Sequence, residues 1–333
     1  MKSDSIKKLH LLCGSLANYA NHSRIHRLKM FSHTAARCYV KREDELSFGV
    51  SGSKLRKFLS IIPYCLSHNI KKAVVIGGAY SNHVLAASQL LIENSINPQL
   101  FLLKAHQLKR TGNYLLTSLL VPAESITWIS RNDWPQVHRI VEQYVAANTL
   151  VIPEGACMTQ ALPGALTLAL DILRNQQEHN LIFDHIFIDA GTGMMVIAVI
   201  LVFHWLQMKT HIHVVLLAGD EEKFYHRIYQ LRLLFEDLIE ETIAEILPSS
   251  LLSLYRPCVA PAFGATNQLI FESIKHFLRH EGIITDPIYS AKLFLTAEKV
   301  IIEKSLTGNI LLIHSGGGFT LMGFETDLAK HCD

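Results

Sequence analysis

Short apolar runs that end in glycine turns and alternate with helical segments most constrain the fold of this chain. The first clear unit is the run from Ala73 to Ile76, followed by Gly77-Gly78 and by apolar residues at helical spacing from Asn82 to about Glu93. Other apolar runs predict strands at residues 38–40, 100–103, 126–129, 150–152, 186–188, 213–217 and 310–313. Helical spacing predicts helices at residues 53–67, 135–147, 222–245, 268–280 and 292–303. Alternation of this kind predicts an α/β protein with parallel sheets covered on both faces.

Length, charge and cysteine usage narrow the class of protein. With 333 residues the chain can form two domains or one large α/β unit. A formal net charge of +2 gives no broad basic face, so we expect no nucleic-acid partner. The six cysteines form no CxxC pair, which favours free thiols in a reducing cytoplasm over a disulfide framework or a zinc site. We therefore expect a cytoplasmic protein without a bound metal.

The most apolar run, from Met194 to Phe203, is the candidate for a membrane-spanning segment. It is ten residues long, which is too short to span a bilayer, and Asp189 and His204 flank it. It is predicted to be a buried helix. The charged N-terminal residues resemble no secretory signal. We expect no membrane partner.

A glycine-containing turn from Ser51 to Lys57 delivers Lys54 to the first turn of a predicted helix, with Ser53 near its N-cap. The positive end of the helix dipole disfavours the ammonium form and helps to present a neutral amine, as a Schiff-base lysine requires. By itself the segment is more typical of a solvated lysine. The neighbouring segments favour a functional one.

Three glycine turns follow predicted strands: Gly77-Gly78, Gly191-Thr192-Gly193 and the turn from Ser315 to Gly318. At the carboxyl ends of parallel strands, such turns let helix N-termini direct backbone N–H groups at an anion. Each turn alone is also typical of ordinary structure. The second lacks the third glycine of the dinucleotide-binding pattern, so a Rossmann dinucleotide site is poorly supported.

The order of the motifs is more informative than any one of them. Along the chain they are KRED (41–44), SGSKLRK (51–57), GGAYSNH (77–83), PEGA (153–156), AGTG (190–193), DPIYSAK (286–292) and IHSGG (313–317). This succession, which extends from about residue 39 to about residue 325, resembles the fold type II, tryptophan synthase beta-like enzymes that depend on pyridoxal 5'-phosphate (PLP). Within them it is most similar to the branch of D-cysteine desulfhydrase and 1-aminocyclopropane-1-carboxylate (ACC) deaminase. The resemblance implies PLP as the cofactor.

The resemblance implies roles for three residues near the first two motifs. Lys54 matches the lysine that forms the Schiff base with PLP. Asn82 matches the asparagine that binds the phenolic oxygen of the cofactor, and Ser81 the serine near the substrate carboxylate. A neutral amide can bind a phenolate without quenching the electron sink. The structural alternative for Ser81 and Asn82 is an ordinary N-cap pair.

Two residues of the later motifs carry further implied roles. Tyr289 matches a tyrosine that faces the substrate and is the candidate acid or base, with a buried structural tyrosine as the alternative. Ser315 matches the hydroxyl that meets the pyridine nitrogen. ACC deaminases place a glutamate where this chain has Ser290. A neutral hydroxyl at that nitrogen leaves the ring unprotonated, which favours elimination and thus desulfhydrase-like chemistry.

The phosphate loop departs from the family pattern. The resemblance assigns the phosphate to Gly191, Thr192 and Gly193, in a loop that usually reads GSGGT or GTGGT. Met194 replaces a glycine, and Met195 replaces a hydroxyl donor. Backbone amides and the helix dipole remain, so we expect weakened phosphate binding rather than none.

The substrate region also departs from the pattern. Tyr80 replaces glutamine, Cys157-Met158 replaces Ser-Asn, and Phe263 replaces a tyrosine. Two hypotheses follow. The first is a lyase that converts D-cysteine to pyruvate, sulfide and ammonia, with ACC ring opening as its alternative. The second is a divergent relative with little or no activity.

The resemblance also implies an architecture of two three-layer α/β domains with PLP in the cleft between them. The large domain would consist of residues 1–57 and 165–333, and the small domain of residues 58–164. A homodimer and a small amino-acid substrate are implied as well.

Overall fold

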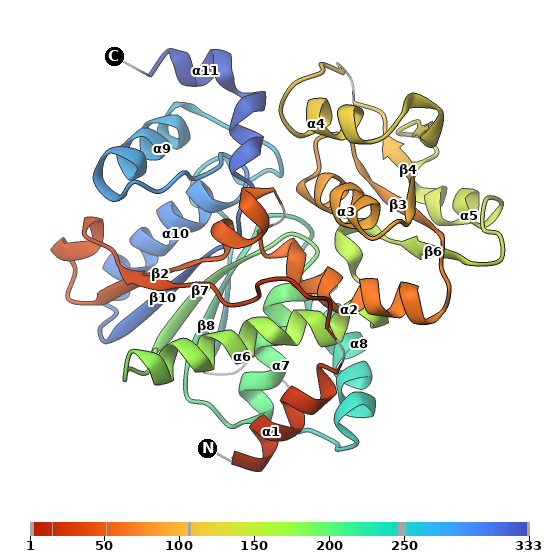
Figure 1. The fold of residues 1–333 in the computed structure, drawn as a ribbon. Coiled ribbons are helices and arrows are strands. Elements are labelled where there is room, and N and C mark those ends of the chain that lie inside the picture. The colour runs from red at the N-terminus through yellow and green to blue at the C-terminus, as the bar shows by residue number, and fades with distance from the viewer. Residues whose placement is uncertain (1–2, 15, 51, 106–107, 246–250, 332–333) are drawn as a thin grey trace.

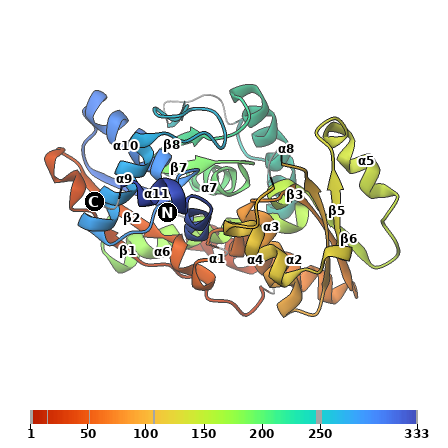
Figure 2. The same cartoon turned by 90° about the horizontal axis from the view of Figure 1, so that it is seen from above.

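The computed structural model describes residues 3–14, 16–50, 52–105, 108–245 and 251–331. The chain forms two sheets that lie side by side, with helices packed against both (Figure 1). Seen from above, the smaller sheet lies beside the larger one rather than stacked on it (Figure 2). The predicted α/β class with two layered units is confirmed, while the domain boundaries stay a prediction.

The larger sheet has six strands in the order β1-β2-β10-β7-β8-β9. Their bounds are β1 (Ile25–Arg27), β2 (Arg37–Arg42), β7 (His185–Ala190), β8 (His211–Leu216), β9 (Leu252–Tyr255) and β10 (Asn309–His314). All neighbours pair in parallel except β1 and β2, which are antiparallel. The antiparallel edge is one departure from the predicted parallel sheet.

Helices cover both faces of this sheet. They are α6 (Leu162–Glu178), α7 (Met194–Trp205), α8 (Glu221–Ile239), α9 (Gln268–Glu281) and α10 (Ser290–Glu303). Helix α1 (Ser3–Leu12) packs against α6 and α8, and α11 (Glu325–Ala329) packs beside α9. Alternate residues of β7 divide between the two faces. Ile186 and Ile188 belong to the core that contains α7, whereas Phe187 packs with Leu293 and Phe294 of α10. Burial on both faces explains why β7 is a continuous apolar run.

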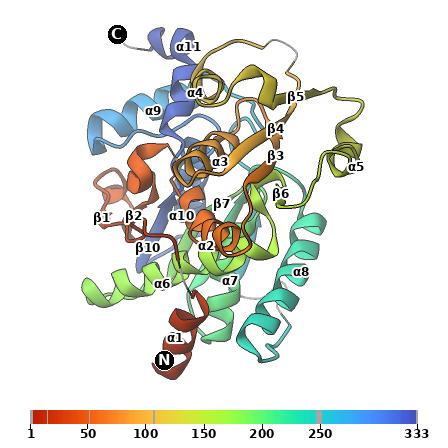
Figure 3. The ribbon, with the colours of Figure 1, turned by 45° about the vertical axis from the view of Figure 1, so that its right-hand side comes forward.

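The smaller sheet has four parallel strands in the order β5-β4-β3-β6. Its strands are β3 (Lys72–Gly78), β4 (Asn97–Leu103), β5 (Ile126–Ile129) and β6 (Thr149–Ile152), and its helices are α2 (Lys54–Ser67), α3 (Asn82–Glu93), α4 (Gly112–Leu120) and α5 (Val137–Glu142). Helix α2 contacts both α3 and α6, so it joins the two halves of the molecule (Figure 3).

Short 3-10 helices complete the chain. They are η1 (Met30–His33), η2 (Glu43–Gly49), η3 (Ala123–Ser125), η4 (Trp134–Gln136), η5 (Glu154–Ala156), η6 (Thr159–Ala161) and η7 (Gly318–Gly323).

Two predicted helices are shorter than expected. Helix α8 ends at Ile239 rather than Glu245, because Glu240 adopts a left-handed conformation at φ 54°. The carboxylate of Glu236 then accepts a hydrogen bond from the Ile243 N–H at 3.0 Å. Helix α5 ends at Glu142 rather than near Ala147, and the ring of Tyr144 beyond it packs edge-on against Phe101.

The apolar run beginning at Met194 is the buried helix α7, as predicted. Among the residues that the structure describes, no helix is both long and apolar enough to cross a membrane. The described cysteines are free thiols, namely Cys13, Cys38, Cys65, Cys157 and Cys258. Cys332 lies outside the described residues.

Candidate active site

The predicted site residues gather where the carboxyl ends of the two sheets meet. Two contacts show the meeting. The amide of Asn82, after β3, lies against Gly317, after β10. The side chain of Thr192, after β7, lies against Gly155, after β6. Carboxyl ends of parallel strands are where ligands bind in such sheets, because the loops and helix N-termini there leave backbone groups free.

Lys54 begins helix α2, as predicted, and its loop rests on the glycine turn after β10. Gly52 has φ +51°, and a Cβ there would lie 2.9 Å from the Cα of Gly316, so only glycine fits. The Ser53 N–H donates a hydrogen bond to the Ser315 carbonyl at 3.0 Å. Ser53 is the N-cap residue, although its hydroxyl forms no capping bond. Ser51 lies outside the described residues.

A buried cluster of charges supports the start of α2. The Arg56 guanidinium donates to Glu43 Oε1 at 2.7 Å and to Asp171 Oδ2 at 2.7 Å. The Lys41 ammonium donates to Asp171 Oδ2 at 2.6 Å. Burial raises the pKa of Asp171, but Lys41 and Arg56 outweigh it and lower that pKa to about 2. Asp171 of α6 therefore joins the KRED and SGSKLRK motifs close to Lys54.

Tyr289 faces Lys54. The Lys54 Nζ lies 5.3 Å from the centroid of the Tyr289 ring. Asp286 fixes this position, because its carboxylate accepts hydrogen bonds from the Tyr289 N–H at 2.8 Å and from the Ser290 hydroxyl at 2.8 Å. Burial raises the pKa of the Tyr289 phenol, and the carboxylates of Asp286 and Asp189 raise it further. The phenol is therefore protonated at neutral pH and can donate a proton.

Ser81 and Asn82 sit at the start of α3. The Ser81 hydroxyl accepts a hydrogen bond from the His83 N–H at 3.1 Å, so it caps this helix and keeps its own proton as a donor; its role at the substrate carboxylate stays a prediction. The Asn82 carbonyl oxygen accepts from Asn113 at 2.7 Å and from Thr320 at 3.0 Å. Since both bonds go to the oxygen, the amide nitrogen is left as the donor. That orientation suits a phenolate ligand.

The loop Gly191-Thr192-Gly193 leads into α7. Gly193 is the N-cap residue at φ 87°, and the ring of Tyr289 lies 3.7 Å from where a Cβ of Gly191 would be. Met194 is 1% exposed, so its side chain packs in the core rather than in the loop. The first turn of α7 keeps free N–H groups for an anion.

Lys57 and Asp189 also lie in this region, although neither was predicted as a site residue. Lys57 follows Lys54 by three residues on the same helix and donates to the Gly155 carbonyl at 2.6 Å. Burial, aided by the Lys54 charge, lowers the pKa of Lys57 to about 8. Its spacing of three residues from Lys54 on a predicted helix could have identified it from the sequence.

Asp189, one residue before the end of β7, lies beside Ser315, the predicted partner of the ring nitrogen. Burial raises the pKa of the Asp189 carboxyl, and Lys54 and the Ser315 hydroxyl oppose that rise. Despite this proximity, Asp189 Oδ1 and Ser315 Oγ each lack a well-oriented hydrogen-bond partner among the described residues. Buried polar atoms without partners are rare in native proteins and indicate room for a ligand.

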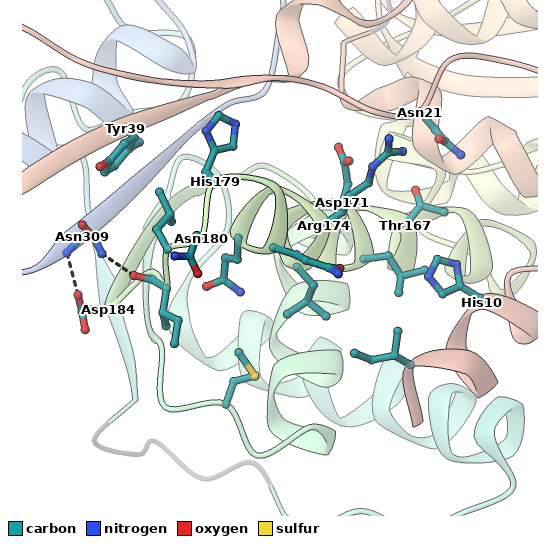
Figure 4. Close-up of a pocket in the computed structure, with 18 of the residues that line it drawn as sticks. His10, Asn21, Tyr39, Thr167, Asp171, Arg174, His179, Asn180, Asp184 and Asn309 are labelled. Atoms are coloured by element: carbon teal, nitrogen blue, oxygen red, sulfur yellow. Dashed lines mark hydrogen bonds between the residues drawn. The ribbon is translucent and has the colours of Figure 1, made fainter. Parts of the chain in front are cut away.

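A broad groove of about 1540 Å³ lies elsewhere, along α6 (Figure 4). It is lined by Asp184 and Asn309, which stand at the starting ends of β7 and β10. None of the predicted site residues is among the described residues that line it. Ligands of parallel sheets bind at the opposite, carboxyl ends, so the groove is not the candidate active site.

The residues present fit PLP. Lys54 offers an amine, the Asn82 amide a donor for the phenolic oxygen, and the unpartnered Ser315 hydroxyl a partner for the pyridine nitrogen. The loop before α7 offers backbone amides for the phosphate. Phe263 lies edge-on to Tyr289 at 6.2 Å and is 59% exposed, so it stands at the rim of this site.

Comparisons with known proteins agree with this fit. Residues 20–316 match the family described as pyridoxal-phosphate dependent enzyme. A putative ACC deaminase of Thermotoga maritima is 26% identical, over 85% of this chain and 89% of that protein. D-cysteine desulfhydrase of Serratia proteamaculans is 23% identical, over 86% of this chain and 88% of that protein. A crystal structure of an ACC deaminase homologue superposes with a TM-score of 0.83 at 21% identity, covering 97% of this chain and 98% of the other. The chain therefore belongs to the pyridoxal-phosphate dependent enzymes.

Proposed function

We propose that this protein is a PLP-dependent lyase that removes a β-substituent from a small amino acid, with D-cysteine as the favoured substrate. The overall reaction takes D-cysteine and water to pyruvate, hydrogen sulfide and ammonia. The observation that carries the proposal is the position of the Lys54 Nζ, 5.3 Å from the centroid of the Tyr289 ring, whose phenol is protonated. One group accepts a proton and the other donates one, as an elimination requires.

Bound PLP would supply the electron sink for charge that develops at the substrate Cα. Lys54 would bind the cofactor covalently through its Nζ. The amino group of the substrate would displace it, and the freed Nζ would then take the Cα proton. Tyr289 would give its phenolic proton to the departing sulfur. The Ser81 hydroxyl and the N–H groups at the start of α3 would hold the substrate carboxylate.

The remaining residues would orient the cofactor and offset the charge of its phosphate. The Asn82 amide would donate to the phenolic oxygen, since its own oxygen is already occupied. Lys57, with a pKa lowered to about 8, would add positive charge near the phosphate end. Ser290 cannot play the part of the glutamate found in ACC deaminases, because Asp286 engages both its backbone and its hydroxyl.

A second candidate, ACC ring opening to 2-oxobutanoate and ammonia, is favoured by one observation. Asp189 places a carboxyl close to Ser315, and such a group can protonate the pyridine nitrogen. A protonated ring is the stronger electron sink. Asp189 would thus act on the pyridine nitrogen as the glutamate of ACC deaminases does.

The test is a product assay on the PLP-loaded protein with D-cysteine, L-cysteine, β-chloro-D-alanine and ACC. We expect pyruvate and sulfide from D-cysteine, and pyruvate from β-chloro-D-alanine. Only 2-oxobutanoate, from ACC, would select the second candidate. No ketoacid from any of the four, with PLP bound, would contradict both and favour the divergent relative. The predicted homodimer stays a prediction that light scattering can check.

A further inference from the structure

The phosphate end of the site lacks one of the two hydroxyl side chains that are usual in such a loop, because Met195 stands at that position. Met194 is buried in the core, and Met195 packs against it, so neither offers a donor to an anion. Apart from the Thr192 hydroxyl, the loop between β7 and α7 must therefore rely on its backbone N–H groups. Their direction then determines how well the loop can hold a phosphate.

Arg227 of α8 reaches this loop from outside. Its Nη1 donates a hydrogen bond to the Thr192 carbonyl. In a trans peptide the carbonyl and the following N–H point in opposite directions. Anchoring the Thr192 carbonyl toward α8 therefore turns the Gly193 N–H away from α8. Gly193 has φ 87°, a conformation that glycine adopts at little cost.

Thr192 is also held on its other side. A Cβ at Gly155 would collide with the Thr192 side chain, so the two residues are in close contact. The Gly155 carbonyl in turn accepts the 2.6 Å bond from Lys57. Glu154, next to Gly155, feels the charge of Arg227, which opposes the rise that burial causes in its pKa. The loop is thus fixed between η5 and α8.

We propose that Arg227 is a positioning residue for the phosphate of PLP. It holds the Thr192 carbonyl so that the Gly193 N–H faces the phosphate, and its charge makes the loop more favourable for an anion. It thereby compensates for the hydroxyl that is missing at Met195. The inference rests on the proposed use of this loop for the cofactor phosphate.

The test compares PLP with pyridoxal, which has no phosphate. Equilibrium dissociation constants for both are measured by absorbance or fluorescence titration of the wild-type protein, Arg227→Ala and Arg227→Lys. Loss of a hydrogen bond of this charged kind should raise the Kd of PLP about tenfold in Arg227→Ala. The Kd of pyridoxal should stay unchanged. Arg227→Lys keeps a cationic donor and should recover part of the loss.

Lys223→Ala is the matched control, because it removes one positive charge from the same helix at a side chain that is 75% exposed and pairs only with Asp220 among the described residues. It should leave both constants unchanged. An unchanged Kd of PLP in Arg227→Ala would overturn the inference, as would an equal rise for PLP and pyridoxal. A wild-type protein that binds PLP no better than pyridoxal would instead contradict the use of this loop for phosphate.

Discussion

The reactive end of the site, around Lys54, and its phosphate end, around Thr192, are built in different ways. At the reactive end, side chains with matching donors and acceptors point at one another, and a buried charge cluster supports them. At the phosphate end, Met195 has taken the place of a donor, and the loop is held from outside by Arg227 and Gly155. In the proposed function, the chemistry therefore depends on local side chains, whereas cofactor retention depends on contacts from distant elements.

Replacing Lys54, at the reactive end, should have the largest effect. Lys54→Ala should lower turnover of D-cysteine by about a thousandfold, since the loss includes proton transfer as well as the covalent attachment of the cofactor. Pyruvate release measured with excess PLP checks it. Lys57→Ala, one turn along the same face, should keep a covalent cofactor. Parental turnover in Lys54→Ala would show that the reactive end is misassigned.

Removing the acid from the reactive end should have the next largest effect. Tyr289→Phe should reduce kcat about a hundredfold, because the phenol no longer donates to the leaving group. The Kd of PLP should be unchanged, since the phosphate end is untouched. Phe263→Tyr, which adds a phenol at the rim, is the companion variant and should not lower kcat. An unaltered kcat in Tyr289→Phe would remove Tyr289 from the mechanism.

The charge cluster below the reactive end should make the fold acid-labile. The folded pKa of Asp171 is lowered to about 2, below its ordinary value, so its ionised form stabilises the fold. That contribution is present above about pH 4 and is lost as the pH falls toward about 2; it amounts to about 2 kcal/mol. Free energies of unfolding measured between pH 6 and 2.5 check it. Asp171→Asn should be less stable at pH 6 and should show a smaller pH slope; an unchanged slope would contradict the assignment.

Restoring a donor at the phosphate end should have the smallest effect. Met195→Thr should tighten PLP binding about threefold to tenfold, because a hydroxyl returns beside the phosphate. Met194→Thr is the contrasting variant: it puts a hydroxyl into the core and should lower the melting temperature instead. A weaker Kd for PLP in Met195→Thr would show that the loop is already complete.

The same division explains what the sequence could and could not predict. Strands, glycine turns and the positions of Lys54, Asn82, Tyr289 and Ser315 follow from local patterns, and the structure places them at one edge. Their roles remain proposals. Asp171 and Arg227 were not predicted, because each contacts residues far away in the chain and neither lies in a motif.

Helix α6, which carries Asp171, was missed for a related reason. Its buried residues include the polar Thr167, Asp171 and Asn175, whose partners lie on other elements, so polar side chains do not mark its exposed face. The sequence shows that Ser290 stands where ACC deaminases have a glutamate, but it does not show that the Ser290 hydroxyl donates a hydrogen bond to Asp286.

The central claim is that Lys54 carries the cofactor at a site able to hold PLP. The most direct measurement is the visible spectrum of the purified protein with PLP, before and after borohydride, followed by mass analysis of the modified peptide. The account predicts a yellow protein, loss of the visible band on reduction, and a pyridoxyl group on Lys54. A protein that stays colourless with excess PLP, or a label on Lys57 instead, would contradict it.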